Sequence, residues 1–235
     1  MQQIDISDII VLMKMPWFSR GGLESGPLPL ITTTRDENAM RTLSSWVDVP
    51  PSADGVSTGR STHKVLQTFG LLPSQFEGKK FLDIGCGLSK IYADLVRVDF
   101  PPAYGAVVDS HPSALEYQRK YNKGVDVRNA SATKLPFADG EFDVVISNYS
   151  VPCWAQGPEE VRSAFEEATR VLGNGGILAV NPMDCFTTSG DTSLKAMVRE
   201  ELSNQERVFN NPDAWDRVHL PHRQGALLAQ RRPLQ

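Results

Sequence analysis

Cysteine is scarce in this chain of 235 residues, which contains only Cys86, Cys153 and Cys185. Three cysteines cannot all pair with one another, and their spacing matches no zinc-binding pattern. The scarcity excludes a small scaffold held together by disulfides and favours reduced thiols in a cytoplasmic protein. Clusters of Asp, Glu or His with ligand spacing are also lacking, so we expect no metal ion.

The chain also lacks an excess of charge of either sign. Lys and Arg together number 24 and Asp and Glu number 28, which gives a net charge of −4. A surface that clamps nucleic acid needs a surplus of basic side chains to neutralise phosphates. We therefore expect a small-molecule partner and no nucleic acid.

Long hydrophobic runs are absent as well. No window approaches the roughly 18 apolar residues that a membrane-spanning helix needs. Asp5 and Asp8 precede the short apolar stretch near the start, where a secretory signal would carry Lys or Arg. The apolar residues of this stretch have helical spacing, which predicts a short amphipathic helix packed against the domain. We expect no membrane contact.

The chain divides into two regions of different texture. Residues 1–59 are irregular and rich in turn residues, whereas the chain from residue 60 alternates helix-like and strand-like segments. Such alternation is typical of an α/β domain with a mostly parallel sheet. Gly173 is expected to cap the helix that begins at Pro158. We expect strands at 80–84, 104–108, 125–128, 142–147, 176–181 and 226–231, and helices at 62–72, 88–98, 112–121, 158–172 and 193–209.

A glycine-rich motif, FLDIGCG (residues 81–87), ends the first expected strand. Glycine at positions 85 and 87 allows a sharp turn and lets a ligand lie against bare main chain. The helix that follows directs its free N–H groups at this turn. Such a turn cradles either a pyrophosphate or the polar amino-acid end of another nucleoside cofactor.

Asp109 ends the second expected strand. An adjacent parallel strand at this point presents a carboxylate to the hydroxyls of a cofactor ribose. The alternative is an N-cap for the helix that begins at Pro112, a role that Ser110 or His111 could equally fill. A dinucleotide fingerprint would have a third glycine where Lys90 stands, and lysine there disfavours a dinucleotide.

Four segments then resemble, in order, the class I S-adenosylmethionine-dependent methyltransferases, in particular their small-molecule branch. The resemblance covers about residues 60–182 and rests on LDIGCG (82–87), VVDSHPSAL (107–115), ATKLPFADGEFDVVIS (132–147) and EEATRVLGNGGILAV (166–180). It implies a Rossmann-like, doubly wound, mostly parallel seven-stranded sheet with S-adenosylmethionine as cofactor. Residues 60–235 would form the cofactor-binding domain, and residues 1–59 an N-terminal helical lid that covers the substrate.

The resemblance also implies roles for individual residues around this cofactor. Asn148 would border the methyl-transfer site. Apart from the resemblance, Arg60 is a candidate partner of the methionine carboxylate, and its alternative is a solvated surface arginine. Ser131 and Ala132 stand where family members often place an acidic residue and a backbone N–H for the adenine, so this chain departs from the pattern there. The loop of Asp83, Gly85, Cys86 and Gly87 would hold the methionine part, Asp109 the ribose, and Ser110 would pack beside the adenine.

No general base is obvious in the sequence, and one is needed only if the acceptor atom carries a proton. Tyr149, just after the fourth expected strand, is the best-placed candidate, and its alternative is a packed aromatic. His219 and His222 flank Pro221 in a C-terminal turn that could face the pocket, and His219 is our second candidate. His111 is expected to be a capping residue.

Tryptophans lie in the segments expected to cover the site. Trp17 and Trp46 belong to the N-terminal extension, and Trp154 follows the fourth expected strand. Ligands of doubly wound sheets bind at the carboxyl ends of the strands. We therefore predict that these three residues face the acceptor, the alternative being packing against the outer helices.

The leading hypothesis is methyl transfer to an oxygen or nitrogen of a small, hydrophobic or aromatic metabolite. Three alternatives remain open. The chain could bind the cofactor without transferring a methyl group and serve as a scaffold or partner subunit. It could also promote a non-methylating rearrangement, or be an NAD-dependent oxidoreductase, which Lys90 disfavours. The sequence does not indicate an oligomeric state.

Overall fold

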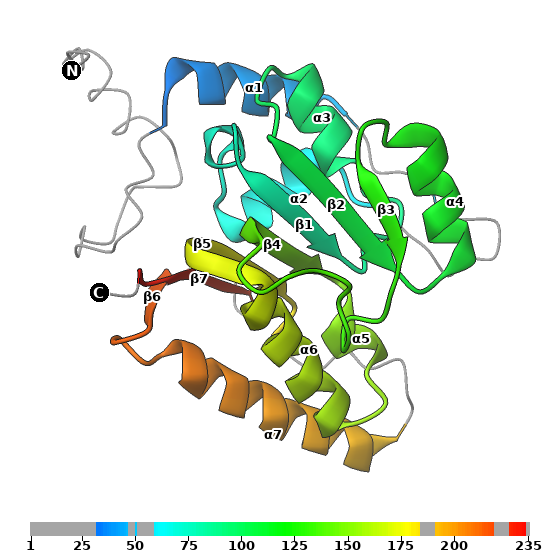
Figure 1. The fold of residues 1–235 in the computed structure, drawn as a ribbon, viewed down its shortest axis with the longest axis vertical. Helices are drawn as coiled ribbons and strands as arrows, with labels where there is room; N and C mark the ends of the chain where they lie inside the picture. The colour runs from blue at the N-terminus through cyan, green and yellow to red at the C-terminus, as the bar shows by residue number, and fades with distance from the viewer. Residues whose placement is uncertain (1–31, 47–49, 51–58, 184–190, 219–225, 234–235) are drawn as a thin grey trace.

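A seven-stranded sheet in the order β3-β2-β1-β4-β5-β7-β6 forms the centre of the computed structural model (Figure 1). The structure describes residues 32–46, 50, 59–183, 191–218 and 226–233. β1 to β5 pair in parallel, and β7 and β6 add an antiparallel hairpin at one end. The strands are β1 Lys80–Ile84, β2 Tyr104–Asp109, β3 Asp126–Asn129, β4 Phe142–Asn148, β5 Leu172–Asn181, β6 Trp215–Val218 and β7 Leu227–Arg231.

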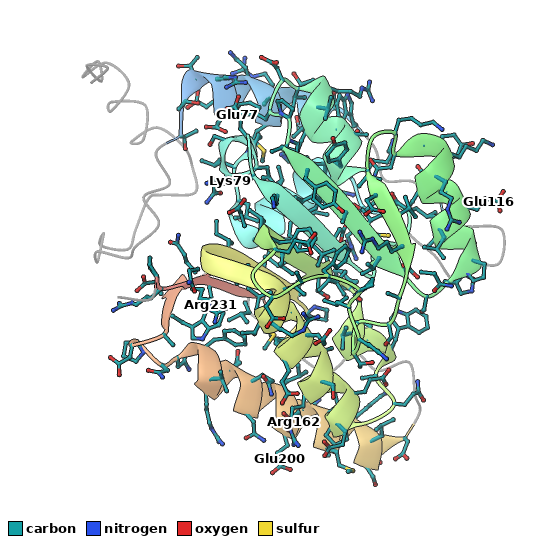
Figure 2. All side chains as sticks on the ribbon, viewed as in Figure 1. Glu77, Lys79, Glu116, Arg162, Glu200 and Arg231 are labelled. Atoms are coloured by element: carbon teal, nitrogen blue, oxygen red, sulfur yellow. The ribbon has the colours of Figure 1, made fainter. Side chains whose placement is uncertain are left out.

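Helices cover both faces of this sheet, so the fold is the expected doubly wound α/β arrangement (Figure 1). One core cluster joins α1, α2 and α3 to the sheet, and the other joins α6 and α7 to its opposite face. On the second face, Arg162 of α6, which is labelled in Figure 2, forms a 2.9 Å ion pair with Glu201 of α7. The helices are α1 Thr34–Ser44, α2 Thr62–Phe69, α3 Ile91–Arg97, α4 Pro112–Tyr121, α5 Val151–Trp154, α6 Pro158–Val171 and α7 Thr192–Phe209, with a short 3₁₀ helix, η3, at Pro73–Gln75.

The central strands are apolar on both faces because helices bury both. Val144 and Ile146 of β4 pack in the α1–α3 cluster, whereas Val145 between them packs in the α6–α7 cluster. All three are at most 1% exposed. Alternate side chains of a strand point to opposite faces, so a run of three apolar residues is what a doubly covered strand requires.

Most expected elements are confirmed, with differences at their ends. β1 and α4 have the expected bounds. α2 ends three residues early at Phe69, because Gly70 adopts φ +67° and caps the helix. The expectation that Gly173 caps α6 is wrong. α6 passes directly into β5 at Leu172, and Gly173 lies within that strand, where an added Cβ would approach the carbonyl oxygen of Gly140 to 3.1 Å.

Four elements were not expected from the sequence: α1, η3, α5 and β6. α1 begins with a capping box, in which Thr33 accepts from the backbone N–H of Asp36 and the Asp36 side chain accepts in return. Leu43 of α1 is fully buried in the same cluster as Leu66 of α2. α1, before residue 59, and α2, after it, thus share one core cluster. The division into a lid and a cofactor-binding domain at residue 59 stays a prediction.

The predicted N-terminal amphipathic helix lies outside the described residues. In the part of the chain that the structure describes, no helix is long and apolar enough to cross a membrane.

Candidate functional site

The glycine-rich loop after β1 has a backbone conformation that favours glycine. Gly85 and Gly87 adopt φ +65° and +51°, in the left-handed region. The N–H groups of Gly85 and Cys86 both donate to the carbonyl oxygen of Val108, at 2.8 and 3.1 Å. A Cβ added at Gly85 would lie 1.9 Å from Ser150 Oγ. The loop is therefore pressed between β2 and the segment that follows β4.

Asp109, at the end of β2, is bonded directly to this loop. Its Oδ2 accepts from the N–H of Gly87 at 2.9 Å, and its Oδ1 accepts from the N–H of His111 at 2.8 Å. A carboxylate oxygen has more than one lone pair, so each oxygen can accept a further hydrogen bond. The two motifs that the sequence analysis singled out thus meet at the carboxyl ends of β1 and β2.

Asp83, the acidic residue of the same motif, lies behind the loop and is only 3% exposed. Burial raises its pKa to about 7, the neighbouring Ser89 hydroxyl opposes the shift, and the charge of Asp109 adds to it. Burial also raises the pKa of the Cys86 thiol. Cys86 therefore contributes its backbone to the loop, and its thiol is not a ready nucleophile.

The segment after β4 forms the neighbouring wall. The side chain of Asn148 accepts from Asn181 Nδ2 at 3.0 Å, and the N–H of Tyr149 donates to the carbonyl oxygen of Asn181 at 2.5 Å. Tyr149 adopts φ +56°, which is uncommon for a bulky residue and is found at functional sites. Its ring is 41% exposed.

Arg60 lies beside both walls. A Cβ on its neighbour Gly59 would come within 2.5 Å of the carbonyl oxygen of Leu88, so the chain here touches the glycine-rich loop. The guanidinium carbon of Arg60 lies 4.2 Å from the centroid of the Tyr149 ring. Arg60 is thus a partner of Tyr149 at the same edge of the sheet.

The residues expected beside the adenine follow β2 and β3. The N–H of Ala130 donates to the carbonyl oxygen of Asp109 at 3.2 Å, which brings the two strand ends together. Ser131 is exposed, and its Oγ lies 2.8 Å from Thr133 Oγ1 in a local turn. Ala132 packs on the core, and Ser110 is exposed next to Asp109.

Of the three predicted acceptor-facing tryptophans, the structure describes Trp46 and Trp154, which lie in different places. Trp154 lies on α5, just after Ser150, and is 51% exposed. Trp46 lies under Arg97, whose guanidinium carbon is 4.3 Å from its ring centroid, at the end of α3 away from the glycine-rich loop. This position corresponds to the alternative for Trp46, packing against the outer helices. Trp17 and His219 lie outside the described residues.

His111 occupies the N-cap position of α4, and its Nδ1 lies 2.8 Å from Ser113 Oγ. Cys86 and Cys153 are buried, and Cys185 lies outside the described residues. Within the described ranges there is no group of three or more His, Cys, Asp or Glu residues that could hold a metal ion.

The sequence analysis missed Gln118 and Asn122, two buried polar residues of α4 and its C-terminal end that contact the loop and α3. A signal was present in the sequence. Gln118 follows Ala114 and Leu115 on the apolar face of the helix, where a polar side chain needs a buried partner.

The site suits a nucleoside cofactor that carries an amino acid. The loop has glycine backbone at Gly85 and Gly87, and Asp109 at the neighbouring strand end has acceptor oxygens that can accept hydrogen bonds from vicinal hydroxyls. A family model described as a methyltransferase domain matches residues 82–180. This match supports the expected class I S-adenosylmethionine-dependent methyltransferase over residues 82–180 of the chain.

Curated proteins that are similar to this chain are named as methyltransferases. The chain is 29% identical over 162 residues to a protein of Mycobacterium ulcerans (strain Agy99) named probable phthiotriol/phenolphthiotriol dimycocerosates methyltransferase 2, covering 63% of this chain and 61% of that protein. It is 27% identical over 158 residues to the O-methyltransferase rstn1 of Aspergillus nomiae, covering 66% of each. The chain thus spans less than two thirds of the length of these relatives.

Two further similarities are more limited. A demethylmenaquinone methyltransferase of Chlorobaculum parvum is 30% identical over 105 residues, which are 43% of this chain and 41% of that protein. The crystal structure of a SAM-dependent methyltransferase from Aquifex aeolicus aligns with a TM-score of 0.47 at 18% identity, covering 72% of this chain and 88% of that one.

Proposed function

We propose that this protein transfers the methyl group of S-adenosylmethionine to an oxygen or nitrogen of a small, hydrophobic or aromatic metabolite. The observation that carries the proposal is the 2.9 Å hydrogen bond from the Gly87 N–H to Asp109 Oδ2. It joins the cradle for the amino-acid part of the cofactor to the carboxylate for its ribose.

The binding residues in this proposal come from four neighbouring strand ends. The loop of Asp83, Gly85, Cys86 and Gly87 holds the methionine part, with Arg60 on its carboxylate. Asp109 accepts hydrogen bonds from the ribose hydroxyls. Ser110, Ser131 and Ala132 lie around the adenine, and Asn148 borders the reacting end.

Bound there, S-adenosylmethionine supplies an electrophilic methyl group on a positively charged sulfur. Because this methyl is already activated, the work of the chain is to hold the acceptor in line with it, which contributes up to roughly 7–11 kcal/mol in well-oriented reactions. Where the acceptor carries a proton, the group that takes it must be a base, and the phenolate form of Tyr149 is our candidate for that role. The exposure of Tyr149 and its position after β4 support this role.

The acceptor class is supported by the names of the relatives. They act, by their names, on phthiotriol dimycocerosates and on demethylmenaquinone, and a third is an O-methyltransferase. The exposed indole of Trp154 beside the site adds an aromatic surface on which an apolar acceptor can lie. Trp17 completes this surface in our proposal.

The test is calorimetry of the full chain with S-adenosylmethionine, S-adenosylhomocysteine and NAD, followed by a labelled-methyl assay on phenols, alcohols and amines. We expect both sulfur nucleosides to bind and a member of the panel to be methylated. Binding of NAD without either sulfur nucleoside contradicts the cofactor assignment. Binding without turnover on any acceptor supports the alternative of a scaffold that does not transfer methyl groups.

A further inference from the structure

Gln118 of α4 is completely buried although its side chain is an amide. Its Nε2 donates to two backbone carbonyl oxygens of the glycine-rich loop, that of Gly87 at 2.9 Å and that of Ser89 at 2.8 Å. Its Oε1 accepts from Asn122 Nδ2 at 2.7 Å. Both donors and the acceptor of this buried amide are therefore used, as a stable buried polar group requires.

Asn122 extends this network to the next helix. It is 2% exposed at the C-terminal end of α4, and its Oδ1 accepts from the N–H of Ala93 at 3.0 Å. Ala93 lies in the first turn of α3, where backbone N–H groups have no partner within their own helix. Asn122, which lies outside α3, thus provides a hydrogen-bond acceptor for one of these N–H groups.

The loop is consequently held on two sides. The N–H of Gly87 donates to Asp109 Oδ2, and its carbonyl oxygen accepts from Gln118 Nε2. The Ser89 N–H donates to the carbonyl oxygen of Cys86 at 2.9 Å, which closes the turn between these two contacts. Hydrogen bonds within this chain therefore fix the path of the backbone from Cys86 to Ser89.

We propose that Gln118, supported by Asn122, is a positioning residue that keeps the glycine-rich loop in the conformation that binds the cofactor. We call these two residues the loop clamp. A loop that is already ordered loses less conformational freedom when its ligand binds, so affinity improves without any contact from the clamp to the ligand. The consequence for S-adenosylmethionine rests on the proposed function, whereas the ordering of the loop does not.

The first variant is Gln118→Met, which keeps the length and burial of the side chain but removes the donor to the carbonyl oxygens of Gly87 and Ser89. We expect its affinity for S-adenosylhomocysteine to fall at least about tenfold, equivalent to about 1.4 kcal/mol. The KM for S-adenosylmethionine should rise while kcat at saturation changes little. Hydrogen exchange of the backbone amides at residues 86–93 should become faster.

The matched control is Gln205→Met on α7. Gln205 is 9% exposed, and its Nε2 donates to Glu201 Oε1 at 2.8 Å, on the α6–α7 face of the sheet. This variant loses a buried hydrogen bond of the same kind away from the loop. It should keep the affinity and the loop exchange of the natural chain even if it is less stable.

A milder variant, Asn122→Ala, removes the support of Gln118 Oε1 and the bond to Ala93, and should shift affinity and exchange in the same direction by less. Unchanged affinity and loop exchange in both clamp variants overturns the proposal, and so does an equal loss in Gln205→Met. If the natural chain binds neither sulfur nucleoside, the proposed function fails, and the exchange comparison still decides whether the clamp orders the loop.

Discussion

At the scale of single residues, Asp109 has two tasks that use the same carboxylate. It orders the loop through the Gly87 N–H, and in the proposed function it accepts from the ribose. Both tasks need a negatively charged acceptor at the end of β2. Removing it therefore affects the cradle and the ribose together.

Asp109→Ala is expected to weaken the binding of S-adenosylhomocysteine by about 10- to 100-fold, since hydrogen bonds to charged groups contribute about 1.5–3 kcal/mol. Calorimetry measures this directly. The control is Asp126→Ala, which removes a carboxylate at the start of the adjacent strand β3, bonded to Tyr104 and Arg128. Unchanged affinity in Asp109→Ala would contradict the ribose assignment.

Tyr149→Phe separates the hydroxyl from the ring. The ring can still lie beneath Arg60, so cofactor affinity should be kept. If Tyr149 Oη takes the acceptor proton, kcat should fall by about 10²-fold or more in steady-state assays. A kcat within twofold of the natural chain would instead assign Tyr149 a packing role. Arg60→Met, which removes the guanidinium, is the companion variant for the methionine carboxylate and should raise the KM for the cofactor.

Asp83 predicts a pH dependence of stability. Because its pKa is raised to about 7 from 3.8, the folded chain binds more protons than the unfolded chain between these values. The free energy of unfolding should therefore decrease as the pH rises through this window, by up to about 4 kcal/mol at about 1.36 kcal/mol per pKa unit. Urea denaturation on either side of the window measures the slope.

Asp83→Asn should flatten this slope, because the amide does not titrate. Asp213→Asn, at an exposed position before β6, is the control and should leave the slope in place. A slope of the same size in Asp83→Asn would show that another group causes it.

The cradle and Asp109 could be predicted from the sequence, because their residue types depend on backbone conformation and strand order. The left-handed backbone conformation of Tyr149 and the hydrogen bonds of Gln118 could not be predicted from the sequence. They depend on contacts between segments separated by about 30 residues, such as Gln118 with Gly87 and Tyr149 with Asn181. Local periodicity contains no information on such pairs.

At the scale of elements, α2 and α3 are joined by a buried hydrogen bond. Thr62 Oγ1 donates to Asp94 Oδ2 at 2.7 Å, and both residues are almost fully buried. Burial raises the pKa of Asp94, and the bond from Thr62 counteracts this. The pair fixes the start of α2, which follows Arg60, against the helix that begins at the loop.

Thr62→Val should destabilise the fold by about 1–3 kcal/mol, because it leaves a buried carboxylate oxygen without its donor while keeping the shape of the side chain. Thr68→Val is the control on the same helix. Thr68 is half-buried, and its hydroxyl donates only to the carbonyl oxygen of Lys64, so the change should stay within about 0.5 kcal/mol. Equal effects in urea denaturation would contradict a special role of the Thr62–Asp94 bond.

Elements with strong periodicity were predictable and those without it were not. The apolar stripe along α6 predicts a helix, and the apolar run of β4 predicts a buried strand. β6 has only four residues, two of them charged, and it exists because β7 offers an edge with which it can pair. α1 is mostly polar, and its helix depends on the Thr33 cap and on the burial of Ala39 and Leu43.

At the scale of the whole molecule, the two ends of the sheet have different tasks. The proposed cofactor site lies at the carboxyl ends of the strands. α1 lies at the other end, where Arg35 donates to Glu77 just before β1; Glu77 is labelled in Figure 2. Trp46 follows α1 and lies on Arg97, close to where the chain enters β2. The two tryptophans predicted for the lid should therefore behave differently.

Trp46→Ala should lower stability by about 1–3 kcal/mol through lost apolar burial and the contact with Arg97. It should leave the KM for the acceptor unchanged. Trp17→Ala should raise that KM with little effect on stability, if Trp17 faces the acceptor. Thermal denaturation and steady-state kinetics separate the two effects, and a raised KM in Trp46→Ala would restore this residue to the acceptor site.

The outermost strands of the sheet, β3 and β6, have a consequence for the protein at high concentration. An unpaired strand edge is a template on which a second chain can add, which is one route to aggregation. β3 carries an ion pair between Asp126 and Arg128 at 2.8 Å, and Asp216 of β6 pairs with Arg232 at 2.6 Å. Charges at both edges disfavour continuation of the sheet from one copy into the next, so concentrated solutions should resist fibril growth by strand addition.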